Sequence, residues 1–242
     1  MRHAATISVV AATLALLAAC SDAGSGDSVT PAEHGDGVPL GSPLIASWAT
    51  ALGPGGYLAG AEADSLTDPD RAIGAASGIS TDVVVLGRGG HITLDLGRTI
   101  ADGEGADIAV WENGIPGGDL LFAELAFVEV STDGTDFARF STATTRDSSV
   151  DPFESIRPAD YAGFAGLHPA GTGTAFDLSQ LIDDPSVASG AVDLSAIRYV
   201  RIIDIVGDGL TFDGTGNAIY DPYPTTGTAG FDLDGVAILR SP

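Results

Sequence analysis

Short apolar runs separated by turns rich in Gly, Asp and Pro fill the chain from about residue 43 onward. Hardly any segment has the 3.6-residue period of a helix, and only QLIDD and the stretch around PADYAGF would form single helical turns. Many short strands with frequent turns predict an all-β protein, an antiparallel β-sandwich of the jelly-roll type with long loops. The runs that predict strands lie at residues 83–87, 91–96, 107–112, 124–131, 136–141, 199–206 and 231–239.

The turn between residues 124–131 and 136–141 contains Asp133 and Gly134. Asp-Gly tolerates the positive φ angles of a tight turn, so these two runs are expected to pair as a hairpin. Residues 142–198 and 207–230 have no clear strand pattern and are expected to form long loops, where binding sites are usually found.

The N-terminus predicts export. Residues 4–19 are almost wholly apolar and follow Met1-Arg2-His3, which matches a secretory signal and is short for a membrane-spanning helix. The end of this stretch, Leu17-Ala18-Ala19-Cys20, resembles a bacterial lipobox. The resemblance implies removal of residues 1–19 and lipid modification of Cys20, which would anchor the protein on the outer side of a membrane of the bacterial cell envelope. The alternative is an ordinary secretion signal followed by an incidental cysteine.

Residues 20–42 contain Gly, Ser, Asp and Pro without periodicity and are expected to form a flexible tether. Residues 43–242 are expected to form a single β-sandwich domain, which is long enough for one sizeable core. Cys20 is the only cysteine, so disulfides within the chain and thiolate metal sites are excluded.

The chain is strongly acidic. It has 33 Asp and Glu residues against 10 basic residues, all of them Arg, and a formal net charge of −23. A nucleic acid partner and charge-driven adhesion to anionic lipid are therefore excluded, because both need a basic surface. Contact with the membrane is expected only through the lipid anchor.

Several acids stand inside apolar strands. Asp107 opens and Glu112 closes one run, Asp204 lies among isoleucines, and Asp232 and Asp234 belong to the last run. A buried carboxylate without a partner costs several kcal/mol, so each of them must be paired, hydrogen-bonded, bound to a metal or protonated.

Ten arginines cannot neutralise all of these acids, although Arg198 and Arg201 are candidate partners for Asp204 or its neighbours. Calcium binds roughly six to eight oxygens and needs neither His nor Cys. We therefore predict a calcium cofactor; the ligands predicted from the strand acids are Asp107, Glu112, Asp232 and Asp234.

The segment FDGTGNAIYD, residues 212–221, has side-chain oxygens at alternate positions and glycines between them. Asp213, Asn217 and Asp221 are the predicted calcium ligands in this loop. It lacks the glutamate of an EF-hand, and a polar turn is the alternative interpretation.

Tyr220 and Tyr223 are the predicted ligand-binding aromatics, because they lie on a predicted loop and tyrosine rings stack on sugars. His168 is a further ligand-binding candidate, with loop packing as its alternative role. Trp111 alternates with Val110 and is expected in the core.

No catalytic residue is predicted, since the chain has no GxSxG, HExxH or GxGxxG motif. The enzymatic alternative is a carbohydrate-active hydrolase or lyase that uses two carboxylates about 5 to 10 Å apart in an open cleft. The candidate carboxylates are Asp107, Glu112, Glu124 and Glu129.

Six segments in a recurrent order carry a family resemblance: DRAIGAASG, VVVLGRGGHITLDLG, GADIAVWENG, FAELAFVEVSTDGTDFARF, YVRIIDIVGD and DPYPTTGTAGFDLDGVAIL. The chain resembles, over most of residues 68–239, bacterial cell-surface proteins with a discoidin-like (galactose-binding-like) jelly roll, some of which carry PEP-CTERM sorting tails and others of which are lipoproteins. Ser77 and Thr215 depart from that pattern, which more often has Asp there, and no C-terminal sorting helix follows residue 239.

The resemblance implies a calcium-stabilised sandwich whose loops bind glycans or another small exposed ligand. Together with the residues above, it predicts a lipid-anchored, non-enzymatic binding module. Besides the enzyme, one further alternative stays open: a lipoprotein that captures a small nutrient such as a corrinoid, which a deep apolar pocket would favour.

Overall fold

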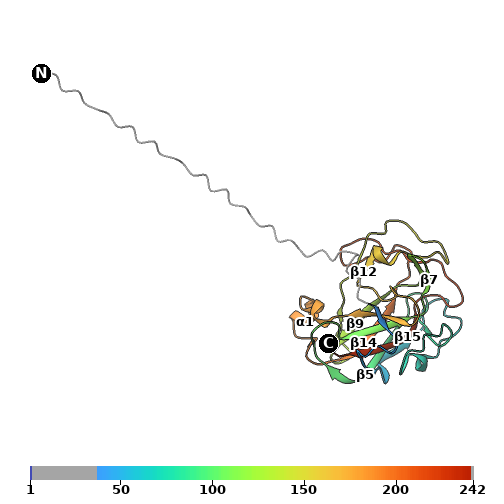
Figure 1. The fold of residues 1–242 in the computed structure, drawn as a ribbon, viewed down its shortest axis with the longest axis horizontal. Coiled ribbons are helices and arrows are strands. Elements are labelled where there is room, and N and C mark those ends of the chain that lie inside the picture. Colours follow the sequence, from blue (N-terminus) through green and yellow to red (C-terminus); the bar gives the residue numbers. More distant parts are fainter. Residues whose placement is uncertain (2–36, 241–242) are drawn as a thin grey trace.

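The computed structural model describes Met1 and residues 37–240, which fold as an antiparallel β-sandwich (Figure 1). The first sheet has six strands: β1 (Gly37–Pro39), β13 (Thr172–Phe176), β6 (Ile108–Glu112), β15 (Asp232–Leu239) and β2 (Ile45–Trp48) in that order, with β4 (Val84–Val85) paired to β15. The second sheet has five: β10 (Ala138–Arg139), β9 (Ala126–Ser131), β14 (Ile197–Asp204), β5 (His91–Ile100) and β3 (Ala51–Leu58).

The main core lies between the two sheets and takes alternate residues from each strand. Ile92 and Leu94 of β5 and Val200 and Ile202 of β14 meet Val110 of β6 in this core. The alternation follows from the strand period of two, which sends successive side chains to opposite faces.

The strands β6 and β15 are buried on both faces. Ala109 and Trp111 of β6 belong to a separate apolar cluster on the outer side of the first sheet, and the Trp111 ring lies 4.7 Å from that of Trp48. Because both faces are covered, β6 is apolar at every position before Glu112.

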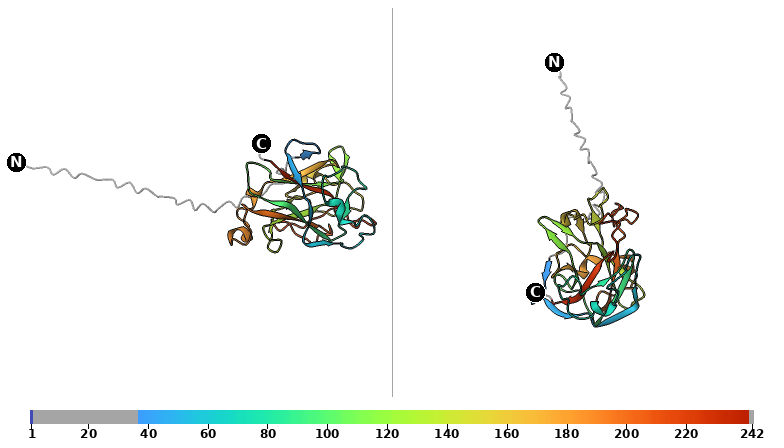
Figure 2. Two further views of the ribbon diagram at one scale, coloured as in Figure 1. Left: turned by 90° about the horizontal axis from the view of Figure 1, so that it is seen from below. Right: turned by 90° about the vertical axis from the view of Figure 1, so that its right-hand side faces the viewer.

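A cap covers one end of the sandwich (Figures 1 and 2). It consists of two small sheets and the loop that follows β14, residues 205–230, around a second core that includes Val150, Ile156, Tyr161 and Phe164. The small sheets pair β7 (Ile115–Gly117) with β8 (Leu120–Phe122), and β11 (Ala143–Thr144) with β12 (Tyr161–Ala162). The helical turns are η1 (Pro69–Ala72), η2 (Pro158–Asp160), η3 (Leu178–Leu181) and α1 (Pro185–Ala188).

The predicted fold class and the seven predicted strands are confirmed, and β9 pairs antiparallel with β10 across the Asp133-Gly134 turn as expected. The chain contains more strands than predicted. Residues 45–58 form β2 and β3, residues 115–122 form β7 and β8, and residues 142–198 contain β11, β12 and β13. The sandwich also begins at Gly37, within the predicted tether. The side chain of Val38 is buried against the outer cluster, a contact that a Gly- and Pro-rich segment does not signal.

The predicted signal peptide, Cys20 and the tether up to residue 36 lie outside the described residues. Within residues 37–240, no helix has the length and apolar character needed to cross a membrane.

Candidate functional site

Five buried carboxylates gather where the sandwich meets the cap, and we call them the inner acid cluster. None of the five is more than 8% exposed. For every member except Asp232, the negative charge of at least one other member raises the pKa of the carboxyl group. The five carboxylates are therefore close enough to interact electrostatically. The members are Glu112, Glu124, Asp204, Asp221 and Asp232.

Strand register brings these acids together. Leu233 of β15 is opposite Glu112 of β6, which puts Asp232 beside Glu112 at the same end of the sheet. In the second sheet, Asp204 at the end of β14 is opposite Ala126, two residues after Glu124. The cluster therefore forms from the ends of strands in both sheets, and Asp221 joins it from the cap loop.

Neutral donors satisfy three members of the cluster. Oε1 of Glu124 accepts hydrogen bonds from Thr225 Oγ1 (2.6 Å) and from the backbone N–H of Gly230 (2.9 Å). The carboxylate of Asp204 accepts from the N–H groups of Gly89 and Phe231, both at 2.7 Å. Oδ2 of Asp221 accepts from the N–H of Leu125 at 2.9 Å.

The predicted arginine partners of Asp204 are elsewhere. Arg198 forms an ion pair with Asp95 at 2.9 Å. Arg201 pairs with Glu129 and donates from Nε to Oε2 of Glu129 at 2.7 Å. That prediction was wrong because Arg201 alternates with Ile202 along β14 and lies on the face of the second sheet opposite the main core.

The other two members, Glu112 and Asp232, each have an oxygen without a hydrogen-bond partner. These atoms are Oε2 of Glu112 and Oδ1 of Asp232, and both are buried. Oδ2 of Asp232 accepts from Nδ2 of Asn113 at 3.0 Å. Both residues, together with Glu124, line a small, partly open cavity of about 60 Å³.

Burial is the main cause of the raised pKa values in this cluster. It raises the pKa of Glu112 well above its ordinary value, and the charges of Asp232 and Glu124 add to the effect. The pKa of Glu124 rises to about 8 and that of Asp232 to about 7, again chiefly through burial. Such a group either keeps its protons at neutral pH or ionises around a bound cation.

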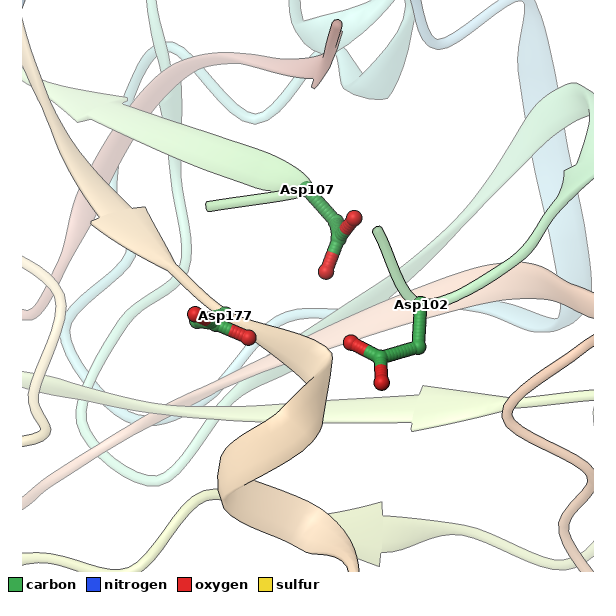
Figure 3. Close-up of side chains that lie close together, drawn as sticks. All are labelled: Asp102, Asp107 and Asp177. Atoms are coloured by element: carbon green, nitrogen blue, oxygen red, sulfur yellow. The ribbon is translucent and has the colours of Figure 1, made fainter. Parts of the chain in front are cut away.

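Asp107 lies at the opposite end of β6 from Glu112 and belongs to a second acidic group, with Asp102 and Asp177 (Figure 3). One ligand atom from each of the three lies within 4.8 Å of the others. Asp107 also accepts hydrogen bonds from the N–H groups of Gly103 (3.0 Å) and Leu178 (2.9 Å). The predicted metal ligands Asp107 and Glu112 therefore do not share one site.

The predicted ligands Asp213 and Asn217 are bonded to each other. Oδ1 of Asp213 accepts from the N–H groups of Thr215 (2.9 Å) and Asn217 (2.8 Å) and from Thr215 Oγ1 (2.8 Å), while Oδ2 accepts from the N–H of Thr144 (2.7 Å). These bonds offset the effect of burial and lower the pKa of Asp213. The carboxylate thus organises the loop through donors of the chain itself.

Asp234 is similarly occupied. It accepts hydrogen bonds from the N–H groups of Ser77 (2.8 Å) and Gly78 (2.7 Å) and from the Ser77 hydroxyl. Ser77, which stands where an Asp was expected, is therefore a donor to Asp234 and not a second carboxylate beside it.

The three predicted ligand-binding residues do not form one site. Tyr220 lines an open hollow of about 420 Å³ on the cap, which we call the cap hollow. The guanidinium of Arg88 lies over the ring of Tyr223, with Cζ of Arg88 5.5 Å from the ring centre. His168 packs against Gly37, where an added Cβ would be 3.2 Å from the imidazole ring.

The cap hollow and the cavity contain residues that the sequence did not single out. Arg146 and Asp147 line the hollow, and Asn113 and Thr225 line the cavity. These residues lie in irregular segments without a recognisable motif, so only the tertiary structure reveals their neighbours. Glu124 can be recognised in the sequence as an acid directly before an apolar strand, which makes it a catalytic candidate and does not indicate that it lines this cavity.

The sequence matches no protein-family model, and a search of curated proteins finds no match. The resemblance to bacterial cell-surface proteins with a discoidin-like jelly roll therefore stays a prediction, and function is inferred from the residues of this chain.

Proposed function

We propose that this protein is a non-enzymatic binding module of the bacterial cell envelope, anchored by a lipid on Cys20 and stabilised by calcium, which binds carbohydrate in the cap hollow. The observation that carries the proposal is the lining of that hollow, which combines one aromatic ring with several polar side chains. The lining residues are Thr144, Thr145, Arg146, Asp147, Asn217, Ala218 and Tyr220.

The hollow is held in shape before any ligand binds. Arg146 donates from Nε to the carbonyl of Ser148 (2.8 Å) and from Nη2 to that of Ser149 (2.9 Å). Asn217 donates from Nδ2 to the carbonyl of Thr144 (3.2 Å), which joins the two segments that form the walls. A preorganised site loses less conformational entropy when a ligand binds.

These side chains match the chemistry of a sugar. Arginine, aspartate and asparagine offer planar donors and acceptors for neighbouring hydroxyl groups, and a tyrosine ring offers an apolar face for the C–H groups. A volume of about 420 Å³ lies within the range of small-ligand sites and suits one or two sugar rings.

The buried acids do not favour the enzymatic alternative. Glu112, Glu124 and Asp232 line a cavity of about 60 Å³, which has room for a cation and a few water molecules and none for a sugar ring. A glycosidase needs its two carboxylates on either side of an accessible bond. This group therefore lacks the open cleft that hydrolysis requires.

The test is a glycan-array screen of the full chain in detergent with calcium, followed by calorimetric titration of any glycan that binds. We expect Tyr220→Ala and Asp147→Asn each to weaken binding at least tenfold, since the first removes the stacking ring and the second a charged acceptor. Asp147 is exposed, so its replacement by Asn leaves the packing of the cap intact.

Tyr199→Ala is the matched control, because Tyr199 is also half-buried and lies on β14, outside the hollow. It should leave glycan affinity unchanged. An array without any bound glycan, or equal loss of affinity in all three variants, would contradict a sugar site in the cap hollow.

A further inference from the structure

We propose that the cavity lined by Glu112, Glu124 and Asp232 is a binding site for one calcium ion, which ties the cap to the sandwich. The inference deepens the proposed function, on which it rests only for the choice of calcium as the cation. It assigns the cation to one of several acidic groups in the described part of the chain.

The two buried oxygens without partners are the first reason. Within residues 37–240, Oε2 of Glu112 and Oδ1 of Asp232 accept no hydrogen bond, although Glu112 is only 4% and Asp232 only 8% exposed. Nearly all buried polar atoms in proteins have a partner, so two unpartnered acceptors on residues that line one small cavity indicate a missing positive group. By contrast, the buried oxygens of Asp204 and Asp213 accept from backbone donors.

The donor set fits a hard cation. Three carboxylates line the cavity, and the hydroxyl groups of Thr225, Thr226 and Thr228 supply further oxygens. Nδ2 of Asn113 donates to the carbonyl of Ser80 and to Asp232, which leaves its Oδ1 as an acceptor. Calcium takes six to eight such oxygens and accepts an irregular arrangement, whereas transition metals favour nitrogen or sulfur ligands that this cavity lacks.

The size and charge of the cavity also favour a bound cation. A volume of about 60 Å³ holds an ion with a few water molecules and excludes the guanidinium of an arginine together with its chain. Arg88, whose charge lowers the pKa of Asp204, donates from Nη1 to the carbonyl of Thr225 and pairs with Glu62 at 3.5 Å. Among the residues that the structure describes, no arginine lines the cavity to neutralise its carboxylates.

The acidic group of Asp102, Asp107 and Asp177 is the competing location. Its carboxylates come as close together as a metal site requires, but both oxygens of Asp107 already accept backbone hydrogen bonds. Asp177 likewise accepts from the N–H of Ser179 at 2.9 Å, as the cap of η3. Asp107, the buried member of this group, therefore has a backbone donor for each of its oxygens, unlike Glu112 and Asp232.

The experiment is calorimetric titration of calcium chloride into the full chain, purified in detergent and freed of metal with EDTA, together with thermal unfolding in both states. We expect one calcium per chain. We also expect the melting temperature to rise by about 5–10 °C when free calcium is about 100 times the dissociation constant.

Two double variants locate the site. Glu112→Gln with Asp232→Asn should abolish the rise, because amides keep the shape of the side chains but remove two charges from the cavity. Asp102→Asn with Asp177→Asn should leave the rise unchanged. The opposite pattern, or a wild-type chain that takes up no calcium, would overturn the proposal.

A measurement on the wild-type chain keeps the proposal testable should the cavity variant fail to fold. Crystals soaked in terbium chloride should give an anomalous peak among Glu112, Glu124 and Asp232, since terbium replaces calcium at oxygen sites. A peak at Asp102, Asp107 and Asp177 alone would overturn it. Neither experiment contains a glycan, so an inactive glycan array would contradict the sugar site and leave this result standing.

Discussion

At the scale of single residues, the buried acids divide according to what their oxygens meet. Asp213 accepts hydrogen bonds from Thr215 and Asn217 of its own loop and from Thr144, whereas Asp234 accepts them from the distant segment of Ser77 and Gly78. Glu112 and Asp232 each have one carboxylate oxygen without a hydrogen-bond partner among the described residues. The same residue type in a similar apolar context therefore has two different roles, decided by whether backbone N–H groups reach it.

Asp221 gives a prediction for pH. Its side chain is 1% exposed, and burial, with the charges of Asp204 and Glu124, raises its pKa well above its ordinary value of 3.8. The folded chain therefore keeps a proton that the unfolded chain loses above about pH 4, so the free energy of unfolding falls as pH rises beyond that point. In EDTA we expect the free energy of unfolding to fall between pH 5 and pH 8.

Urea unfolding at several pH values measures this dependence. Asp221→Asn mimics the protonated side chain and should make the profile flatter. Asp119→Asn, which changes an exposed side chain between β7 and β8, should leave the slope as it is. Equal slopes in wild type and Asp221→Asn would show that Asp221 does not carry the effect.

At the scale of elements, the packing of β13 against β6 depends on a glycine. Gly173 faces the Trp111 ring so closely that an added Cβ would be 2.6 Å from Cδ2 of the indole. Trp111 is fully buried in the outer cluster between β1, β13 and β2 and has little space to move. The glycine therefore allows the largest side chain of β6 to lie flat against its neighbouring strand.

We expect Gly173→Ala to destabilise the fold by about 1–3 kcal/mol, because overpacking displaces either the indole or the β13 backbone. Guanidinium unfolding followed by tryptophan fluorescence measures the loss, and native emission should change as Trp111 moves. Gly117→Ala is the control: it lies on the exposed strand β7, where an added Cβ would meet only Leu120 O at 3.8 Å. Similar losses in both variants would argue against a specific contact with Trp111.

At the scale of the whole molecule, the inner acid cluster joins two packing units. Glu112 and Asp232 come from the first sheet, Glu124 leads into the second sheet, and Thr225 belongs to the cap loop. The main core and the second core lie on either side of this junction. A cation held there would restrain the cap, and with it the cap hollow, relative to the sandwich.

Hydrogen exchange measures this restraint. We expect calcium to slow the exchange of backbone amides in residues 222–231 by about tenfold or more, because local opening of the loop must first release the ion. Amides of β5 and β14, which lie in the centre of the second sheet, should change far less. Protection limited to residues 102–107 and 177–178 would assign the ion to the other acidic group.

The fold class could be predicted from the sequence, because the period-two alternation of strands such as β5 and β14 is a local property of the chain. The sequence also marked Glu112, Asp204 and Asp232 as unusual, since an acid within an apolar run must find a partner whatever the fold. It did not signal β1 or β13, whose Gly- and Pro-rich or Thr- and Gly-rich segments become strands only through contacts with distant partners.

Which acids lie close together depends on the tertiary fold. Asp107 and Glu112 are five positions apart and lie in different sites, whereas Glu112 and Asp232 are far apart in sequence and line one cavity. Strand register sets those distances, and register results from the packing of both sheets and not from any single segment. The role of each carboxylate depends on its hydrogen-bond partners. Those partners are set by the fold and not by the sequence motif around the carboxylate.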